Sequence, residues 1–159
     1  MAIFLKYGDL KGEVTSVSHK DWIECHSFQW GVGRGISAGV GGGSKREATA
    51  PSVSEIMLTK TMDIADPLLL KEAIGGKGIT AFVEMTQTDD SGKHIPYQKY
   101  KLEDAMISGY SITTGGDRPS VSFSINFDKF DSEYVAIDSK FNAVSKGHVI
   151  YTISAAKSG

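Results

Sequence analysis

Apolar and polar side chains alternate with a period of two over much of this chain. The clearest case is 120–127, with the sequence SVSFSINF, in which four apolar side chains alternate with four polar ones. Successive side chains of a strand point to opposite faces, so this segment predicts a strand with one buried and one hydrated face. Runs rich in β-branched and aromatic residues predict further strands at 3–7, 22–30, 53–62, 79–88, 97–102, 106–113 and 149–154.

The connections between these runs have the composition of turns. The sequence DDSG at 89–92 joins two predicted strands as a hairpin loop, and Gly115, Gly116 and Asp117 lead to Pro119 in another turn. Such short connections indicate antiparallel pairing. We therefore predict a mostly β fold of roughly eight or nine strands, an antiparallel β-barrel of two packed sheets, because closure removes exposed sheet edges.

One segment predicts a helix. The sequence DPLLLKEAIG at 66–75 offers Asp66 as N-cap, Pro67 at the first helical position and Gly75 or Gly76 as the C-terminal stop. The helix is short and is expected to cap one side or end of the barrel. We expect one domain over 1–159, with a short polar tail at 155–159 and no further domain behind it.

The predicted strand at 22–30 has apolar residues on both faces. Trp22, Phe28 and Trp30 share one face with Glu24 and His26, whereas Ile23 and Cys25 lie on the other. A strand of this kind is usually covered on both sides, either by helix and loops of the same subunit or by another subunit. The sequence leaves these two explanations open.

A Gly-rich segment at about 31–52 interrupts the pattern. It contains seven glycines and little that could be buried. Loops of this length inside a compact domain are uncommon and are generally disordered or ordered by a partner. We therefore take this extended loop as the main functional feature of the sequence.

Patterns that would indicate catalysis or cofactor binding are weak. The sequence GRGISA at 33–38 formally fits a dinucleotide-binding pattern, but the glycines after it oppose the helix that such a site needs. Four histidines and one cysteine match no metal-ligand spacing, and His19, in a turn beside Lys20 and Asp21, is expected at the surface. The Asp66 carboxylate has a capping role. We predict no catalytic residue, no cofactor and no metal.

Composition narrows the class of partner. Charged residues make up 23% of the chain, and the net charge is −2 with both signs interspersed, so neither nucleic acid nor an anionic membrane is indicated. The apolar run before Lys6 has five residues, fewer than the roughly seven to fifteen of a secretory signal. We expect synthesis in the cytoplasm without a cleavable leader, and the lone Cys25 fits that compartment.

An ordered set of segments resembles the haemolysin-coregulated protein (Hcp) family. The first part contains IFLK at 3–6, KGE at 11–13, HKDWIE at 19–24 and FQWG at 28–31. After the Gly-rich loop come VSEIMLTK at 53–60, PLLL at 67–70, YKLEDAMIS at 100–108, VSFSINF at 121–127 and Tyr134. The resemblance covers approximately residues 2 to 153.

The resemblance implies a structural role without catalysis. Subunits of this family are β-barrels with a lateral helix that form hexameric rings, and the rings stack into the inner tube of a bacterial type VI secretion system, similar to a phage tail tube. A contractile sheath surrounds the tube, a spike protein tips it, and the lumen can carry small effector proteins. The protein would be cytoplasmic when made and then secreted to the medium or a target cell without a signal peptide.

The resemblance also implies roles for particular residues. We expect the long loop to contact a neighbouring ring or subunit, with Arg34, Ser37, Lys45, Arg46 and Glu47 at that interface. The residues Gln29 and Asp117 match positions that the family turns towards the lumen. The chain departs from the family at Cys25, where an aliphatic residue is common, and at 135–147, which is less recognisable.

Two alternatives remain open at this point. A tail-tube protein of a phage-like particle would share the fold and the ring. A monomeric β-barrel that binds a small ligand belongs to a different class, and its solution mass would distinguish it.

Overall fold

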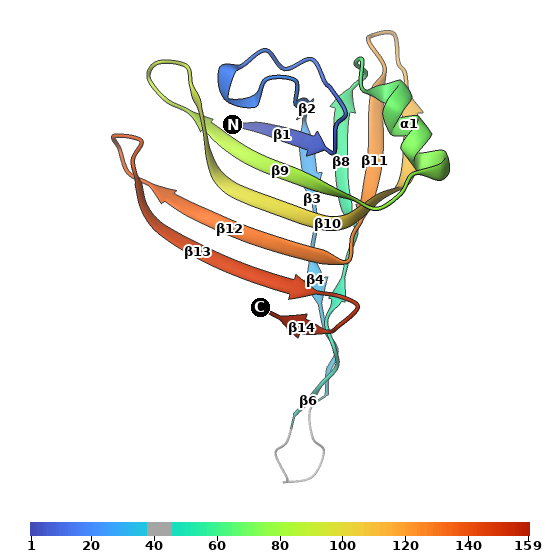
Figure 1. The fold of residues 1–159 in the computed structure, drawn as a ribbon, viewed down its shortest axis with the longest axis vertical. Helices are drawn as coiled ribbons and strands as arrows, with labels where there is room; N and C mark the ends of the chain where they lie inside the picture. Colours follow the sequence, from blue (N-terminus) through green and yellow to red (C-terminus); the bar gives the residue numbers. More distant parts are fainter. Residues whose placement is uncertain (38–45) are drawn as a thin grey trace.

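A computed structural model describes residues 1–37 and 46–159, and it is mostly β (Figure 1). The strands and helices are β1 (Ala2–Tyr7), the 3₁₀ turn η1 (Val17–His19), β2 (Ile23–Cys25), β3 (Ser27–Gln29), β4 (Val32–Gly33), β5 (Ile36–Ser37), β6 (Glu47–Ala48), β7 (Ser52–Val53), β8 (Ile56–Thr61), α1 (Asp66–Gly75), β9 (Ile79–Thr88), β10 (His94–Thr113), β11 (Ser120–Asn126), β12 (Lys129–Ile137), β13 (Ala143–Thr152) and β14 (Lys157–Ser158). The antiparallel β prediction is confirmed.

Two packed layers share the long strand β10. Its N-terminal half pairs with β9 and β12, in a larger sheet that continues through β1 to β2 and through β13 to β14. Its C-terminal half pairs with β11, which continues to β8 and β3. We call this second layer the four-stranded sheet. The two strands predicted at 97–102 and 106–113 are thus one strand, which bends where Asp104 has a φ of 53° and the register shifts.

The ladder of hydrogen bonds does not close, so the expected barrel is open. One end of the strand order is β14 and the other is β3, and β2 pairs with β1 rather than with β8. The chain itself spans the gap, because His26 lies between β2 and β3 and its N–H donates to the Thr59 carbonyl. Figure 1 shows β12 and β13 sweeping outward beyond the other layer.

Cross-strand rows of apolar side chains fill the space between the layers. In the larger sheet, Tyr7, Ala81, Leu102 and Phe130 are directly paired and all buried. In the four-stranded sheet, the corresponding row contains Phe28, Leu58, Phe123 and Tyr110. Burial of such side chains stabilises the fold by roughly 1.5–3 kcal/mol for each large residue.

The crossover at His26 settles how the strand at 22–30 is covered. The prediction of one continuous strand with two apolar faces is wrong. Ile23 and Cys25, which precede the crossover in the sequence, are buried. Phe28 and Trp30, which follow it, pack on the same core. One residue outside the alternation reverses the side on which each later side chain falls. The cover is therefore intramolecular, and Cys25 is buried, as the aliphatic residue common in the family at this position would be.

Helix α1 has the predicted bounds but a different N-terminus from the predicted one. Asp66 is not the N-cap; it is the first helical residue, and its Oδ2 accepts the N–H of Asp63. Asp63 Oδ1 in turn accepts the N–H of Ala65. The N-cap is Ala65, which has no side-chain cap, and these two bonds instead hold the turn that precedes the helix.

The C-terminal region is more regular than predicted. The segment after Tyr134 completes β12, turns at Asp138 to Asn142 and returns as β13. The predicted polar tail includes β14, which pairs Ser158 with Tyr151 and Lys157 with Thr152.

Candidate functional site

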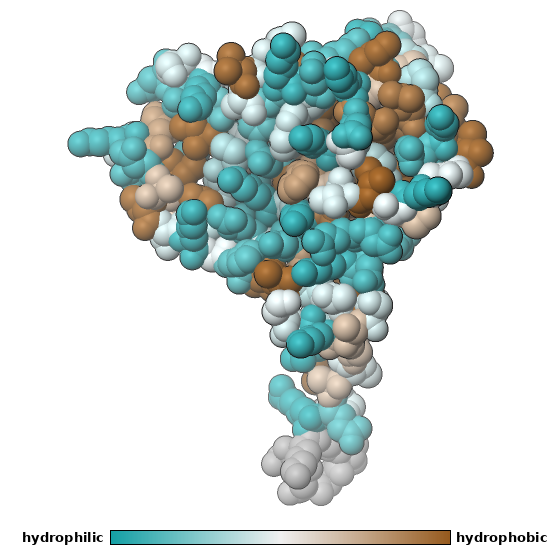
Figure 2. All heavy atoms as spheres, viewed as in Figure 1, coloured by the Kyte–Doolittle hydropathy of each residue, from teal (hydrophilic) through white to brown (hydrophobic). Residues whose placement is uncertain are grey.

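The described part of the Gly-rich loop, residues 31–37 and 46–53, forms a two-stranded extension that leads away from the four-stranded sheet. In this extension, β4 pairs with β7 and β5 pairs with β6. At its base, the Gly31 N–H donates to Ser54 Oγ over 2.9 Å and the Trp30 indole donates to the Ser54 carbonyl over 3.1 Å. Figure 2 shows it as a narrow projection from the body of the molecule.

The predicted interface residues fall on this extension. Arg34, Ser37, Arg46 and Glu47 are all exposed, and Ser37 Oγ donates to the Glu47 carbonyl over 3.3 Å. Lys45, the remaining predicted contact, lies outside the described residues. The structure thus brings four of these side chains together on one ribbon, and their role in stacking stays a prediction.

Ser37 also has a sequence context that could be read as catalytic. The segment 35–39 reads GISAG, which has the G-x-S-x-G form of a nucleophile elbow. Such an elbow requires a sharp turn from a strand into a helix. Ser37 lies instead in β5, within a ribbon, and its hydroxyl is bonded to a main-chain carbonyl. Ala38 and Gly39, the remaining residues of this pattern, lie outside the described residues.

The outer side of the four-stranded sheet is covered with hydroxyl groups. Directly paired residues share a face, and one such row is Ser27, Thr59, Ser122 and Ser111. A neighbouring row contains Gln29, Met57 and Ser124, with Ser108 Oγ 2.8 Å from Ser124 Oγ. These two rows carry no charged side chain. We call them the hydroxyl face.

The two residues predicted to face the lumen lie at opposite ends of this sheet. Gln29 is on the hydroxyl face near the base of the extension. Asp117 is in the turn between β10 and β11, where its Oδ1 accepts the N–H of Arg118 over 2.8 Å. The structure does not bring them together, and their orientation in an assembly stays a prediction.

Both edges of the four-stranded sheet lack a strand partner within residues 1–37 and 46–159. On one side, β3 pairs only with β8. On the other, the half of β10 from Met106 to Thr113 pairs only with β11. Unpaired edges present backbone N–H and C=O groups that another chain can pair with.

The outer side of the larger sheet has a different character. Paired rows on it include Phe4, Glu84, Lys99, Glu133 and His148. His148 Nε2 contacts Asp131, and Lys146 Nζ lies 3.9 Å from Glu133 Oε1. Charged groups therefore gather on this face, opposite to the hydroxyl face.

Helix α1 leaves an apolar surface exposed. Figure 2 shows brown side chains gathered at the upper right, where Figure 1 places α1. The exposed apolar residues of this region are Ile64, Leu68, Leu70 and Ile74.

His19 is buried, so the expectation of a surface histidine is wrong. Its ring stacks on Phe4 with centroids 4.5 Å apart and meets the edge of Trp22. Its Nε2 lies 2.6 Å from Glu84 Oε2, and its Nδ1 lies 2.9 Å from Ser18 Oγ. These contacts fasten the loop before β2 onto the charged side of the larger sheet.

A buried cluster around Lys60 was not apparent in the sequence. Lys60 Nζ, fully buried, lies 2.9 Å from Asp63 Oδ1 and 2.5 Å from Asp66 Oδ2, and the Tyr110 hydroxyl donates to Asp66 Oδ1. Burial alone would raise the pKa of Asp66, but the hydrogen bonds from Lys60, the Asp63 amide and Tyr110 hold that pKa below its ordinary value. Burial also raises the pKa of the Cys25 thiol to about 12.

One sequence-family comparison decides the assignment. A family model described as "Type VI secretion system effector, Hcp" matches residues 4–134. The chain belongs to the Hcp family. The predicted resemblance is confirmed, and the chain is placed among structural, secreted proteins that assemble with themselves in type VI secretion.

Solved structures agree with the family assignment. A type VI secretion system protein superposes with a TM-score of 0.88 and 26% identity, over 99% of both chains. Hcp1 from Salmonella typhimurium gives 0.79 and 24%, over 99% of this chain and 98% of that one. A type VI secretion system effector from Yersinia pestis gives 0.70 and 22%, over 92% and 97%. Among curated proteins, none matches this Hcp-family chain.

Membrane-spanning helices and metal-binding clusters are the remaining features to consider in the Hcp-family chain. Over the residues that the structure describes, no helix is long and apolar enough to cross a membrane. The same residues hold no group of three His, Cys, Asp or Glu side chains arranged to bind a metal ion.

Proposed function

We propose that this chain is the tube subunit of a type VI secretion system, with hexameric rings that stack end to end. The observation that carries the proposal is the four-stranded sheet, which has an uncharged hydroxyl face and two unpaired edges. A head-to-tail contact repeats around a ring until it closes. Pairing β3 of one copy with Met106–Thr113 of the next would join successive sheets into one continuous wall.

In such a ring the hydroxyl face lines the lumen. A wall of serine, threonine and glutamine side chains, with Met57 among them and Glu55 bonded to Ser108 at its edge, hydrogen-bonds to many polar surfaces and carries few charges. This suits passage of small effector proteins that enter folded and must leave. Gln29 then faces the lumen, and Asp117 lies at its rim.

The extension and the charged face supply the remaining contacts. We propose that the extension reaches a neighbouring ring, with Arg34, Ser37, Lys45, Arg46 and Glu47 as its contacts. The charged outer side of the larger sheet would face the contractile sheath, and the end of the tube would meet the spike. The single domain is made in the cytoplasm and exported by contraction, without a signal peptide.

The test is the absolute mass of the purified protein over a range of concentrations, by native mass spectrometry and light scattering, with negative-stain imaging. We expect six-subunit rings with a central hole. A monomer at every concentration would contradict the proposal and favour the ligand-binding barrel.

Variants of the loop distinguish ring formation from ring stacking. Deleting 39–43 or reversing the charges of Lys45 and Arg46 should leave the six-subunit mass unchanged and shorten or abolish tubes, and reduce secretion. A loss of folded protein, measured by circular dichroism, would show instead that the extension belongs to the core.

A further inference from the structure

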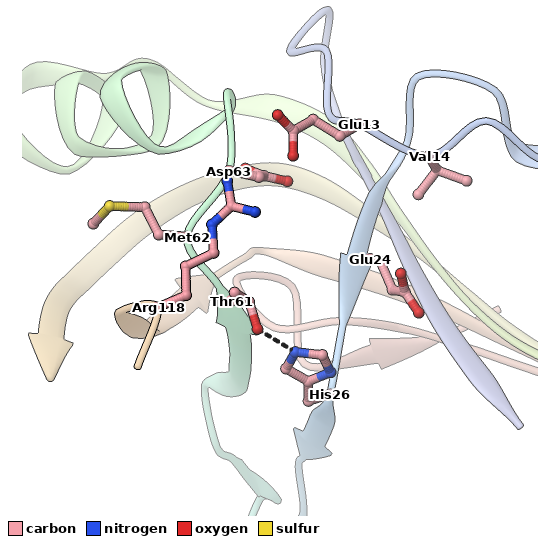
Figure 3. Close-up of a pocket in the computed structure, with 8 residues that line it drawn as sticks. All are labelled: Glu13, Val14, Glu24, His26, Thr61, Met62, Asp63 and Arg118. Atoms are coloured by element: carbon pink, nitrogen blue, oxygen red, sulfur yellow. Dashed lines mark hydrogen bonds between the residues drawn. The ribbon is translucent and has the colours of Figure 1, made fainter. Parts of the chain in front are cut away.

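A cavity lies at the end of the molecule opposite to the extension. Its volume is about 240 Å³, and its lining residues are Glu13, Val14, Glu24, His26, Thr61, Met62, Asp63 and Arg118 (Figure 3). They come from the loop before β2, from β2 and the crossover, from the end of β8 and from the turn before β11. We call it the end cavity.

The acidic groups of the end cavity have spare bonding capacity. The hydrogen bonds of the Asp63 carboxylate fall on Oδ1, which accepts from Lys60 and from the Ala65 amide. Within the described residues, no hydrogen bond or ion pair joins the side chain of Glu13 or Glu24 to another group. Figure 3 shows the Glu13 carboxylate directed toward Asp63 and Arg118, whereas Glu24 projects from β2 on the side away from Arg118.

The other polar groups limit what can bind. His26 Nε2 is occupied by Thr61 Oγ1 at 2.7 Å, and Arg118 is the cationic side chain of the lining. Asp63 is already paired with Lys60, so Glu13 and Glu24 against the single Arg118 leave an excess of negative charge. A planar guanidinium is the cation that pairs with carboxylates through two parallel hydrogen bonds, so an arginine side chain fits this cavity in size and in charge.

The extension carries such side chains at the other end of the same strands. Strand β8 runs from Ile56, beside the base of the extension, to Thr61 in the cavity, and β3 runs the opposite way from His26. From Gly31 to Ser37, an extended chain spans about 20 Å. Arg34 and Arg46 are exposed on it, and no ion pair within 1–37 and 46–159 involves either. Arg46 directly precedes the pairing of Glu47 with Ser37 and so lies farther from the base of the extension than Arg34.

We propose that the end cavity receives the Arg46 side chain of a second copy of this chain in the adjacent ring. The inference rests on the proposed function, and it names the receptor for the extension. Opposite ends of one subunit carry complementary charge, so each added ring presents the same cavity to the next one. Glu13 and Glu24 bind the incoming guanidinium, and Asp63 and Arg118 line the cavity beside them.

The test is a charge exchange between the two partners. Glu24→Arg and Arg46→Glu, each alone, should weaken ring-to-ring association about tenfold or more, because a close ion pair becomes a close repulsion. The Glu24→Arg, Arg46→Glu double variant should recover most of that loss. Native mass spectrometry measures the rings, and sedimentation with imaging measures the stacks.

A matched control defines the outcome. Glu133→Arg, on the charged face of the larger sheet, should alter stacking less than about threefold. Unchanged stacking in Glu24→Arg, or no recovery in the double variant while rings persist, would overturn the proposal. If wild-type protein forms no rings, the proposed function fails first, which is a separate result.

A cross-link covers the case in which a charge reversal disturbs folding or stacks are short-lived. The Glu13→Cys, Arg46→Cys variant should form disulfides between rings under mild oxidation, giving covalent ladders on non-reducing gels. Cys25 is buried and does not compete. Glu133→Cys with Arg46→Cys is the matched control, and equal ladders from both pairs would also overturn the proposal.

Discussion

Lys60 is the most deeply buried of the described charged side chains. Its ammonium group is fully buried, and the two carboxylates that neutralise it belong to the turn that starts α1. A buried charge without a partner lowers the stability of the fold. Removing any one member of this cluster would therefore leave the charges of the others uncompensated. The cluster thereby ties β8 to α1 and, through Tyr110, to β10.

Replacing Lys60 by Met should destabilise the protein by about 3–5 kcal/mol, because the buried Asp66 and the partly buried Asp63 would lose their cation. Urea unfolding followed by tryptophan fluorescence measures the change. Lys101→Met is the control, since its 3.5 Å contact with Glu103 is exposed and should contribute at most about 1 kcal/mol. Similar losses in both variants would show that the buried pair is not special.

The lowered pKa of Asp66 sets a direction for acid stability. A carboxyl whose pKa is lower when folded contributes stability that is fully present above its unfolded value, here about 3.8, and is lost as pH falls through the folded value. The difference in unfolding free energy between wild type and Asp66→Asn should therefore be constant near neutral pH and shrink below about pH 4. Denaturant titrations at several pH values check this. A constant difference down to acid pH would contradict it.

At the scale of elements, regular alternation was predictive and local interruptions were not. Strand β9 has the bounds that the sequence predicts, because its period is unbroken over its whole length. The crossover at His26 and the bend at Asp104 changed the interpretation of two other strands, and neither has a compositional signal. Alternation also indicated the serine face of β11, but only strand pairing shows that β3, β8 and β10 extend it.

Candidate site residues could be predicted from the sequence only where they belong to one segment of it. Arg34, Ser37, Arg46 and Glu47 belong to one segment of the sequence and are brought to one ribbon. The end cavity combines residues from 13 to 118, so no local pattern predicts it. The same holds for His19 and Glu84, which are far apart in sequence and meet only because β1 and β9 pair.

The loop between β1 and β2 depends on Gly12. A Cβ atom at this position would lie 2.3 Å from the Trp22 carbonyl oxygen, which is main chain and cannot rotate away. Gly12→Ala should therefore lower stability by about 1–3 kcal/mol, as overpacking does. Thermal unfolding measures it. Gly115→Ala, where a Cβ would meet nothing within 4 Å, should leave the midpoint unchanged, and equal shifts would contradict the steric explanation.

At the scale of the whole molecule, the proposed assembly uses two kinds of contact. Ring closure rests on main-chain pairing at sheet edges, whereas stacking rests on charged side chains of the extension and the end cavity. Exposed ion pairs weaken as salt screens them, and main-chain hydrogen bonds do so much less. The two associations should therefore respond differently to ionic strength.

Raising the salt concentration should separate stacks into intact rings before rings separate into subunits. Sedimentation velocity across a salt series measures both species in one experiment. Rings that dissociate at lower salt than stacks would contradict this division of roles.

The crossover at His26 also limits how the sequence can change over evolutionary time. One residue there decides which side chains of β2 and β3 point to the core. An insertion or deletion of a single residue between Ile23 and Gln29 would turn core residues outward and polar ones inward. Length variation among descendants of this chain should therefore collect in the extension, where an added residue displaces nothing buried, and be purged from the few positions around His26.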